Sequence, residues 1–546
     1  MLADPTQPGP YAVATLTYGS GTDRRRPEYG TEVDLHTEPL DISQLWAGPK
    51  GLAKPYFQWF WGFSRENVPL NGRVWYPQGA GPFPLVVMVH GNHNAADFSD
   101  AGYAYLGELL ASRGYIFASV DENFLNGGAT YKAEGEMPVR AYLLLRHLEV
   151  WQQFNETAGG PLNGKVDMNN IALMGHSRGG EAAAVASVFN GMTYYPLNSD
   201  VAMNFNFHIK AVAALAPCDG QYKVRGLPTA PANIDYMVLQ GGHDTDVYAF
   251  SGVNQYERVI WNDNQFHFKT AVWVEHMNHG GMNTTWGSDR EGPISWVYQE
   301  RPLLDGEEQR QVVKAYVSAF LDASLKGDRS LLPFLRDYRM GAVWLPATSY
   351  APLFTDSTFQ VVEDFQGNNL TDTPTQPGAT VNHEGLDVTE QKPALRANAL
   401  RQSKAGLLTW EATGASYAIT LPEFWQADPD TALTFALGGA RPKADIDVTV
   451  ELVDRQGNVA RLPLSRYGAP LPQPTNPVTK FGLLDQVMLQ TGAPGPVLRT
   501  FVIPLADFAA ANSAFRPADL QQIRFRFDRT PNGSVVLDDV GLLKIR

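Results

Sequence analysis

The motif Gly175-His176-Ser177-Arg178-Gly179 restricts the fold of this chain more than any other feature. The apolar run 171–174 precedes it, and the alanine-rich stretch 180–189 follows it. A Gly-x-Ser-x-Gly motif between a buried strand and a helix is typical of a strained turn that lifts a serine hydroxyl above the carboxyl end of a sheet. The pattern predicts that Ser177 is a nucleophile; a tight turn that only packs is the alternative.

Strand-like and helix-like segments alternate on both sides of this motif. Short apolar runs are typical of buried strands, and runs with apolar residues at helical spacing are typical of amphipathic helices. The expected strands cover residues 72–77, 85–89, 116–120, 171–174, 212–215, 236–239 and 270–274, and the expected helices cover 103–112, 138–154, 180–189 and 307–325. The alternation predicts an α/β fold with a doubly wound, mostly parallel sheet and helices on both faces.

The pattern changes near residue 350, where helical periodicity gives way to short alternating runs. These runs, separated by Pro, Gly and Asn, predict an all-β sandwich. Its expected strands are 417–421, 433–437, 447–452, 497–503, 523–527 and 535–537. The expected domains are an N-terminal extension packed on the catalytic domain (1–70), the α/β catalytic domain (71–345), a linker (346–358) and the β-sandwich (359–546).

Composition narrows the partners and the compartment. The net charge of −14 disfavours nucleic acid and anionic membranes as partners, and no run of about 18 apolar residues could span a membrane. Cys218 is the only cysteine, so no intramolecular disulfide can form. Residues 1–5 lack the features of a signal peptide. We expect a secreted protein of bacterial type whose signal was removed, with a cytoplasmic protein as the alternative.

A nucleophilic serine needs a histidine base and a carboxylate that orients the histidine. In this type of fold the acid follows the serine along the chain and lies just after a strand. Asp244 follows the expected strand 236–239 and is our choice for the acid. Asp246 is the second choice and Asp219 a distant third, and turn capping is the alternative role for each of them.

The base is expected after the last strand, 270–274, where the chain offers two histidines. We choose His279, because it lies in a glycine-rich loop that can reach back to Ser177. His276 is nearer the strand end and is expected to be a structural hydrogen-bond partner. The two histidines also have His-x-x-His spacing, but no third ligand is evident nearby, so no metal is expected in the active site.

A tetrahedral intermediate needs two backbone N–H donors. Arg178, directly after the serine, is expected to supply one, and Asn92 in the loop after strand 85–89 the other. His93 is the alternative donor, and His90 is expected to stabilise this loop rather than to titrate.

Two aromatic side chains are expected to line the substrate cleft. Phe124 lies in the segment 121–136, and Trp286 follows His279. Packing within the loops is the alternative for both rings.

Three segments resemble the α/β-hydrolase superfamily over roughly residues 70–330: Gly9-Pro10-Tyr11-Ala12-Val13, Val89-His90-Gly91-Asn92 and the motif around Ser177 with Gly180. They are similar to cutinase-like and polyester-hydrolase-like members and to dienelactone-hydrolase relatives. The resemblance implies a serine esterase without a cofactor, acting on carboxylic esters that include bulky or polymeric ones such as polyesters or esterified polysaccharides. A lipase, a peptidase or an acyltransferase on the same scaffold is the alternative, as is a binding protein with an inert hydrolase domain.

The C-terminal region resembles a jelly-roll, carbohydrate-binding-like module at residues 361–365 and 535–542. The resemblance implies a structural Ca²⁺ near Glu363, Asp364 and Asp539, with solvated acidic edges as the alternative. Such a module is expected to assist attachment to a polymer and to be dispensable for the hydrolysis of soluble esters.

Overall fold

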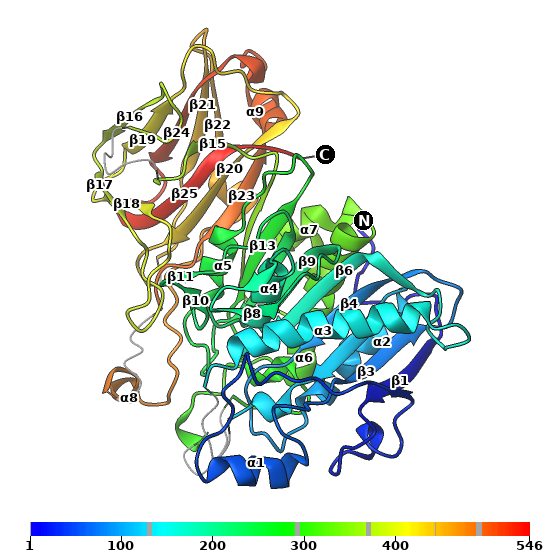
Figure 1. Ribbon diagram of the computed structural model, residues 1–546. Helices are drawn as coiled ribbons and strands as arrows, with labels where there is room; N and C mark the ends of the chain where they lie inside the picture. Colours follow the sequence, from blue (N-terminus) through cyan, green and yellow to red (C-terminus); the bar gives the residue numbers. More distant parts are fainter. Residues whose placement is uncertain are drawn as a thin grey trace.

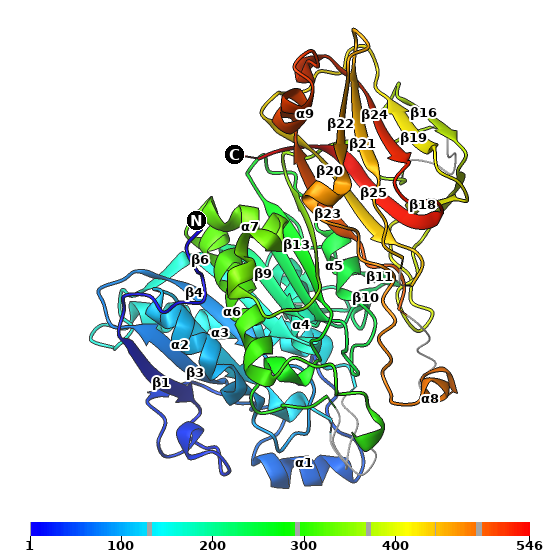
Figure 2. The ribbon, with the colours of Figure 1, turned by 180° about the vertical axis from the view of Figure 1, so that it is seen from behind.

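The computed structural model describes residues 2–127, 134–289, 295–366, 373–442, 444–487 and 494–545. These residues form a mixed α/β structure with a ten-stranded, mostly parallel sheet, together with separate antiparallel sheets near the C-terminus (Figure 1). Helices cover both faces of the large sheet, as the views from the front and from behind show (Figure 2). The predicted α/β class is therefore confirmed.

Six parallel strands make up the centre of the large sheet. In spatial order they are β13 (Phe268–Val274), β12 (Asp235–Gly241), β9 (Ile209–Leu215), β6 (Val166–His176), β4 (Phe83–Val89) and β5 (Ile116–Asp121). Each of the neighbouring pairs is parallel. Their carboxyl ends therefore lie along one edge, where side chains from the following loops can meet.

The apolar run of β4 shows why these strands are buried. Val87 and Val89 belong to the core on one face of the sheet, which also contains side chains of α3 (Met137–Glu156) and α4 (Arg178–Phe189). Val86 and Met88 belong to the core on the other face, with α2 (Ala104–Ser112) and α6 (Gly306–Leu325). Because both faces are covered, the strand is apolar at every position instead of alternating.

Antiparallel strands close both edges of the large sheet. They are β14 (Tyr350–Asp356) beside β13 at one edge, and β3 (Asn71–Pro77) and β1 (Val13–Gly19), followed by the short parallel strand β2 (Leu35–His36), at the other. The segment 346–358, predicted to be a linker, thus contains a strand of the sheet, and so does the predicted extension 1–70. Pro352 is tolerated in β14 because this strand is outermost in the sheet.

The C-terminal residues form two antiparallel sheets, which we call the β-domain (residues 359–545). One sheet contains β17 (Asp387–Gln391), β18 (Ala405–Trp410), β25 (Gly533–Lys544), β20 (Thr431–Gly439) and β23 (Arg499–Pro504), with β15 (Gln360–Glu363) paired to β25. The other contains β16 (Thr380–Glu384), β19 (Ala415–Thr420), β24 (Leu520–Phe527), β21 (Thr449–Asp454) and β22 (Val459–Pro463). Side chains of both sheets, such as Phe435 and Phe525, share one core. The predicted antiparallel β-structure is therefore present, but two short helices, α8 (Gly482–Val487) and α9 (Leu505–Ala511), depart from the expected all-β pattern.

The β-domain packs directly against the large-sheet domain. The backbone N–H of Phe354 in β14 donates to Thr500 Oγ1 in β23 over 2.9 Å, and the buried pair Arg401–Glu257 joins the two domains at 2.6 Å. A loop that carries α8 (Gly482–Val487) extends from the β-domain along the large-sheet domain (Figure 1).

The remaining helices are α1 (Ala53–Trp61), α5 (Gly252–Arg258), α7 (Leu332–Arg336) and α9 (Leu505–Ala511), and the remaining strands are β7 (Tyr194–Tyr195), β8 (Asn198–Ala202), β10 (Lys223–Val224) and β11 (Leu227–Pro228). Within the described ranges, no helix combines the length and the apolar character that a membrane span requires.

Candidate active site

Ser177 occupies a strained turn between the end of β6 and the start of α4. Its φ of 59° and ψ of −124° are unusual for a residue with a side chain, and the surrounding hydrogen bonds hold it there. Its N–H donates to the carbonyl of Leu215 over 2.8 Å, and its carbonyl accepts from Gly180 and Cys218 at 3.0 and 3.2 Å. The turn is therefore fixed by β9 on one side and by α4 on the other.

The two glycines of the motif are required by close packing. A Cβ on Gly175 would lie 1.9 Å from the carbonyl oxygen of Gly179, and a Cβ on Gly179 would lie 2.4 Å from the carbonyl oxygen of Val89. Strand β6, helix α4 and strand β4 can thus approach only where side chains are missing. Substitution of either glycine by a larger residue is therefore incompatible with this turn.

His279 and Asp244 lie in the loops after β13 and β12 and are joined by a hydrogen bond. The distance between His279 Nδ1 and Asp244 Oδ2 is 2.8 Å, and both side chains are buried. The Asp244 carboxylate also accepts from the backbone N–H groups of Asp246 and Val247 at 2.9 and 2.7 Å and from Gln240 Nε2 at 2.9 Å. A carboxylate held by so many donors is a rigid support for the imidazole.

The second ring nitrogen of His279, Nε2, is available to accept a proton. When the ring is neutral, Asp244 accepts the Nδ1 proton, so Nε2 carries a lone pair. Nε2 is buried and forms no hydrogen bond with the residues that the structure describes, and Asp246 Oδ2 lies 3.7 Å from it. His176, directly before Ser177, packs its ring against His279 with centroids 4.7 Å apart. Ser177 is therefore linked to His279 only through the neighbouring ring of His176, and no hydrogen bond joins Ser177 Oγ to His279 Nε2 in the described structure.

Carboxylates around His279 control its protonation. Burial lowers the pKa of His279, but the charge of Asp244 and its hydrogen bond, followed by the charges of Asp246 and Asp289, outweigh burial and raise the pKa to about 9. An imidazolium in this position is thus strongly stabilised, as a base that must hold a proton during a reaction requires.

Asp289 is a site residue that the sequence pattern did not reveal. It accepts from the backbone N–H groups of Gly280 at 2.6 Å and Thr245 at 2.8 Å, so it ties the His279 loop to the Asp244 loop. Burial, with the nearby charge of Asp244, raises the pKa of Asp289 to about 6. No strand or motif precedes it, and only its three-dimensional contacts identify it.

The loop after β4 lies directly against the serine. A Cβ on Gly91 would be 2.4 Å from Ser177 Cβ and 3.0 Å from Ser177 Oγ. His90 holds this loop: its Nε2 accepts from the N–H of Glu122 over 3.0 Å, so its Nδ1 donates to the carbonyl of Gly91 over 2.8 Å. Burial lowers the pKa of His90 to about 3. A neutral, structural His90 agrees with the role expected from the sequence.

The two expected oxyanion donors belong to segments that adjoin Ser177, the loop after β4 and the start of α4. Asn92 follows Gly91, and its side-chain oxygen accepts from the N–H of Gly127 over 2.8 Å, which fixes the loop. Arg178 is the first residue of α4, and its guanidinium is paired with the buried carboxylate of Glu136. The use of their backbone N–H groups as oxyanion donors stays a prediction.

The rings expected to line the cleft are both buried. Trp286 is 4% exposed, stacks on His279 with centroids 5.9 Å apart and donates from Nε1 to Ser99 Oγ over 2.9 Å. Phe124 is 2% exposed and packs edge-on against Phe63. Packing, the alternative left open for these rings, describes both positions better, and Trp286 packs against the ring of His279.

The alternative residues take other roles in the structure. His276 Nδ1 is bonded to Thr348 Oγ1 at 2.8 Å, and Asp219 is paired with Arg258. His93 Nδ1 lies 3.1 Å from Asp97, and its ring stacks on Trp286. Of His276 and His279, only His279 contacts Asp244.

No metal centre is visible in the described part of the chain, which holds no group of three or more His, Cys, Asp or Glu residues that could bind a metal ion. At the acidic positions of the β-domain, Glu363 accepts from the N–H of Phe365 over 2.7 Å and Asp364 accepts from Thr375 Oγ1 over 2.6 Å, while Asp539 adopts a positive φ of 50°. Glu363 is buried, so it does not match the alternative of a solvated acidic edge, and its carboxylate is held by hydrogen bonds within the chain.

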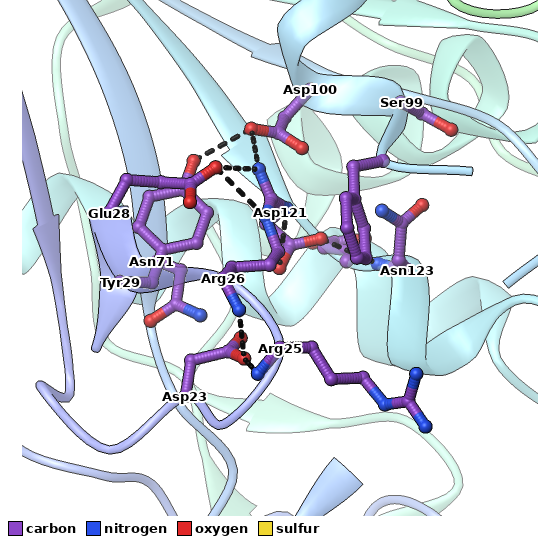
Figure 3. Close-up of polar contacts among 12 residues, drawn as sticks. Asp23, Arg25, Arg26, Glu28, Tyr29, Asn71, Ser99, Asp100, Asp121 and Asn123 are labelled. Carbon is purple, nitrogen blue, oxygen red and sulfur yellow. Dashed lines mark hydrogen bonds and ion pairs between the residues drawn. The ribbon is translucent and has the colours of Figure 1, made fainter. Parts of the chain in front are cut away.

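A buried ionic cluster connects the N-terminal segment to the loops of the site (Figure 3). Arg26 lies 2.7 Å from Asp100 and 3.2 Å from Asp121, the last residue of β5. Arg26 and Arg73 hold the pKa of Asp100 well below its ordinary value, although burial opposes this. Asp121 directly precedes Glu122, whose N–H donates to His90. Asp100 directly follows Ser99, whose hydroxyl oxygen accepts from Trp286. The cluster therefore anchors both supporting loops.

Comparison with known proteins gives no family for the chain: no family model matches it, and no curated protein matches it.

Proposed function

We propose that this protein is a serine hydrolase with an α/β-hydrolase fold that cleaves carboxylic esters through an acyl-enzyme intermediate. The observation that carries the proposal is the 2.8 Å hydrogen bond between His279 and Asp244, and a serine in a strained strand-to-helix turn supports it. The acid and the base follow the serine in the chain order typical of this fold, and each lies after its own parallel strand.

The proposed reaction begins with attack of Ser177 Oγ on the ester carbonyl, while His279 Nε2 takes the serine proton. Asp244 stabilises the resulting imidazolium. The N–H groups of Asn92 and Arg178 stabilise the negative charge on the tetrahedral intermediate. His279 then returns the proton to the departing alcohol. Water, activated by the same histidine, releases the acid and restores the serine.

The proposed substrates are carboxylic esters, including bulky or polymeric ones. Peptidases, lipases and acyltransferases can use the same triad, so a substrate panel separates these activities. p-Nitrophenyl esters of increasing acyl length, a polyester film and acetylated or feruloylated polysaccharides cover the ester classes, and a peptide anilide covers the peptidase. Turnover of esters but not of the anilide is expected, and turnover of the anilide alone would contradict the proposal.

The decisive experiment labels the full-length protein with a fluorophosphonate and maps the modified residue. We expect the label on Ser177, and a loss of roughly a thousandfold or more in kcat for Ser177→Ala. Cys218→Ala is the matched control, because the thiol adjoins Ser177 in space and its pKa is raised by burial, so its removal should leave labelling intact. A label on another residue, or full activity of Ser177→Ala, would overturn the proposal. A folded protein without any turnover would favour the alternative function, a binding protein with an inert hydrolase domain.

A further inference from the structure

A loop of the β-domain reaches the backbone that carries the proposed acid. Asn476 Nδ2 donates to the carbonyl of Gly242 over 3.1 Å and to the carbonyl of Glu275 over 3.5 Å, and it lies 3.4 Å from His243 Nδ1. Gly242 is two residues before Asp244, and Glu275 is four residues before His279. The Asn476 side chain is buried, so these contacts are closed to water. One side chain of the β-domain thus joins the start of both loops.

A buried arginine of the same domain supports this contact. Arg396 is 3% exposed, and its guanidinium donates to the carbonyl oxygen of Asn476. Burial lowers the pKa of Arg396 to about 10, against the opposing charges of Asp485 and Asp244. Arg396 is therefore still positive at neutral pH, between a carboxylate of its own domain and the acid of the proposed triad.

Asp485 holds the loop in shape at its far end. Its carboxylate accepts from the N–H groups of Val478 and Thr479 at 3.0 and 2.8 Å. Residues 478–480 in turn pair with the large-sheet domain, since the N–H of Gln299 donates to Val478 and the N–H of Lys480 donates to Val297. The loop that carries Asn476 is thus attached to both domains.

We propose that Asn476 and Arg396 are positioning residues of the hydrolase site, so that the β-domain completes this site. Asn476 fixes the backbone before Asp244, and Arg396 holds Asn476 and supplies a buried positive charge that acts on Asp244. The inference rests on the proposed function.

The charge of Arg396 has a predictable effect on the base. Three carboxylates and one histidine lie around His279: Asp244, Asp246, Asp289 and His176. Burial holds the pKa of His176 well below its ordinary value. Arg178 is already paired with Glu136. Arg396 acts on Asp244, and on His243 in the same loop, so its positive charge offsets part of the negative charge that stabilises the imidazolium and increases the fraction of neutral His279 at a given pH. Loss of Arg396 therefore favours the protonated, inactive base.

The test measures kcat/KM against pH for p-nitrophenyl acetate with the full-length protein. For Arg396→Gln, we expect the rising limb to move to higher pH by about half a unit or more. Arg396→Lys keeps the charge, so its limb should stay near the wild-type position even if kcat falls. Arg441→Gln, at an exposed arginine of the same domain, is the matched control and should leave the profile unchanged.

Asn476→Ala tests the second role independently. We expect kcat/KM to fall about tenfold, because the buried Gly242 carbonyl loses its hydrogen-bond donor and the loop that carries Asp244 becomes less rigid. An unmoved pH limb in a folded Arg396→Gln variant would overturn the role of its charge, and unchanged kcat/KM in Asn476→Ala would overturn the role of the amide. If Arg396→Gln does not fold, a shifted limb in Arg396→Lys also overturns the charge argument.

Fluorophosphonate labelling of the wild-type protein distinguishes failure of this inference from failure of the proposed function. Labelled Ser177 together with unaffected Arg396 and Asn476 variants means that the hydrolase stands and this inference fails. Absence of both labelling and turnover in the wild-type protein means that the proposed function itself fails.

Discussion

Single residues decide the pH at which the site can work. The proposed base, His279, can accept a proton only when it is neutral, and its pKa is raised to about 9, so kcat/KM should increase as the pH rises through this range. Asp246 contributes to the shift from 3.7 Å, and its side chain is 39% exposed. Removing a carboxylate beside an imidazolium lowers the pKa of the histidine. Asp246→Asn should therefore move the rising limb to lower pH.

The measurement is the pH profile of kcat/KM at low and at high salt. Because Asp246 is partly exposed, salt should reduce the difference between the Asp246→Asn variant and the wild-type protein. Asp41→Asn, at an exposed carboxylate outside the site, serves as the control. A shift to higher pH in Asp246→Asn would contradict the sign argued here.

The two histidines after β13 give a second comparison between single residues. His279→Ala removes the proposed base and should reduce kcat by roughly a thousandfold or more. His276→Ala removes the hydrogen bond to Thr348 and a ring contact with His243, so kcat should stay within about tenfold of the wild-type value. Steady-state kinetics of both variants, with melting curves to confirm folding, check the difference. If only His276→Ala inactivates the protein, His276 is the base and His279 has the structural role.

Ser177, Asp244 and His279 could be chosen from the sequence because each follows an apolar run that ends at the same edge of the sheet. Order along the chain then limits which acid and which histidine can meet the serine. Asp289, Asn476 and Arg396 could not be found in this way. Asp289 acts through backbone N–H groups of two loops, and Asn476 and Arg396 approach from another domain, so no local spacing reveals any of them.

At the scale of elements, burial on both faces made the central strands predictable. Every strand from β4 to β13 in the parallel part of the sheet overlaps an expected apolar run. Among the strands that were not predicted, β14 contains Pro352, and β16 and β17 have alternating half-buried and exposed residues. In both cases pairing with a neighbouring strand, rather than composition, determines the structure.

The loop after β4 offers a test at this scale. Gly91→Ala places a Cβ 2.4 Å from Ser177 Cβ, so the loop must move away from the serine. We expect kcat/KM to fall at least about tenfold, and the free energy of unfolding to fall by about 1–3 kcal/mol. Denaturant unfolding and ester kinetics measure the two effects. Gly191→Ala is the control, because a Cβ there meets no atom within 4 Å. Unchanged kinetics in Gly91→Ala would separate this loop from the site.

At the scale of the whole molecule, the two domains depend on each other. The sequence alone predicts a β-domain that can be removed without loss of soluble-ester hydrolysis. In the structure, β14 belongs to the large sheet, Arg401 pairs with buried Glu257, and Asn476 contacts the acid loop. Removing the β-domain leaves the Glu257 carboxylate without its arginine and exposes the apolar side chains that face Val497.

The chain 1–358 keeps β14 and therefore tests the β-domain rather than the sheet. We expect a lower melting temperature, and a loss of at least about tenfold in kcat/KM for p-nitrophenyl acetate, because the positioning contacts to the Asp244 loop are missing. Arg401→Ala in the full-length protein is the matched comparison: it breaks one buried interdomain pair and should lower the melting temperature while it leaves Asn476 in place. Full activity of the chain 1–358 on the soluble ester would mean that the β-domain serves only attachment to the substrate.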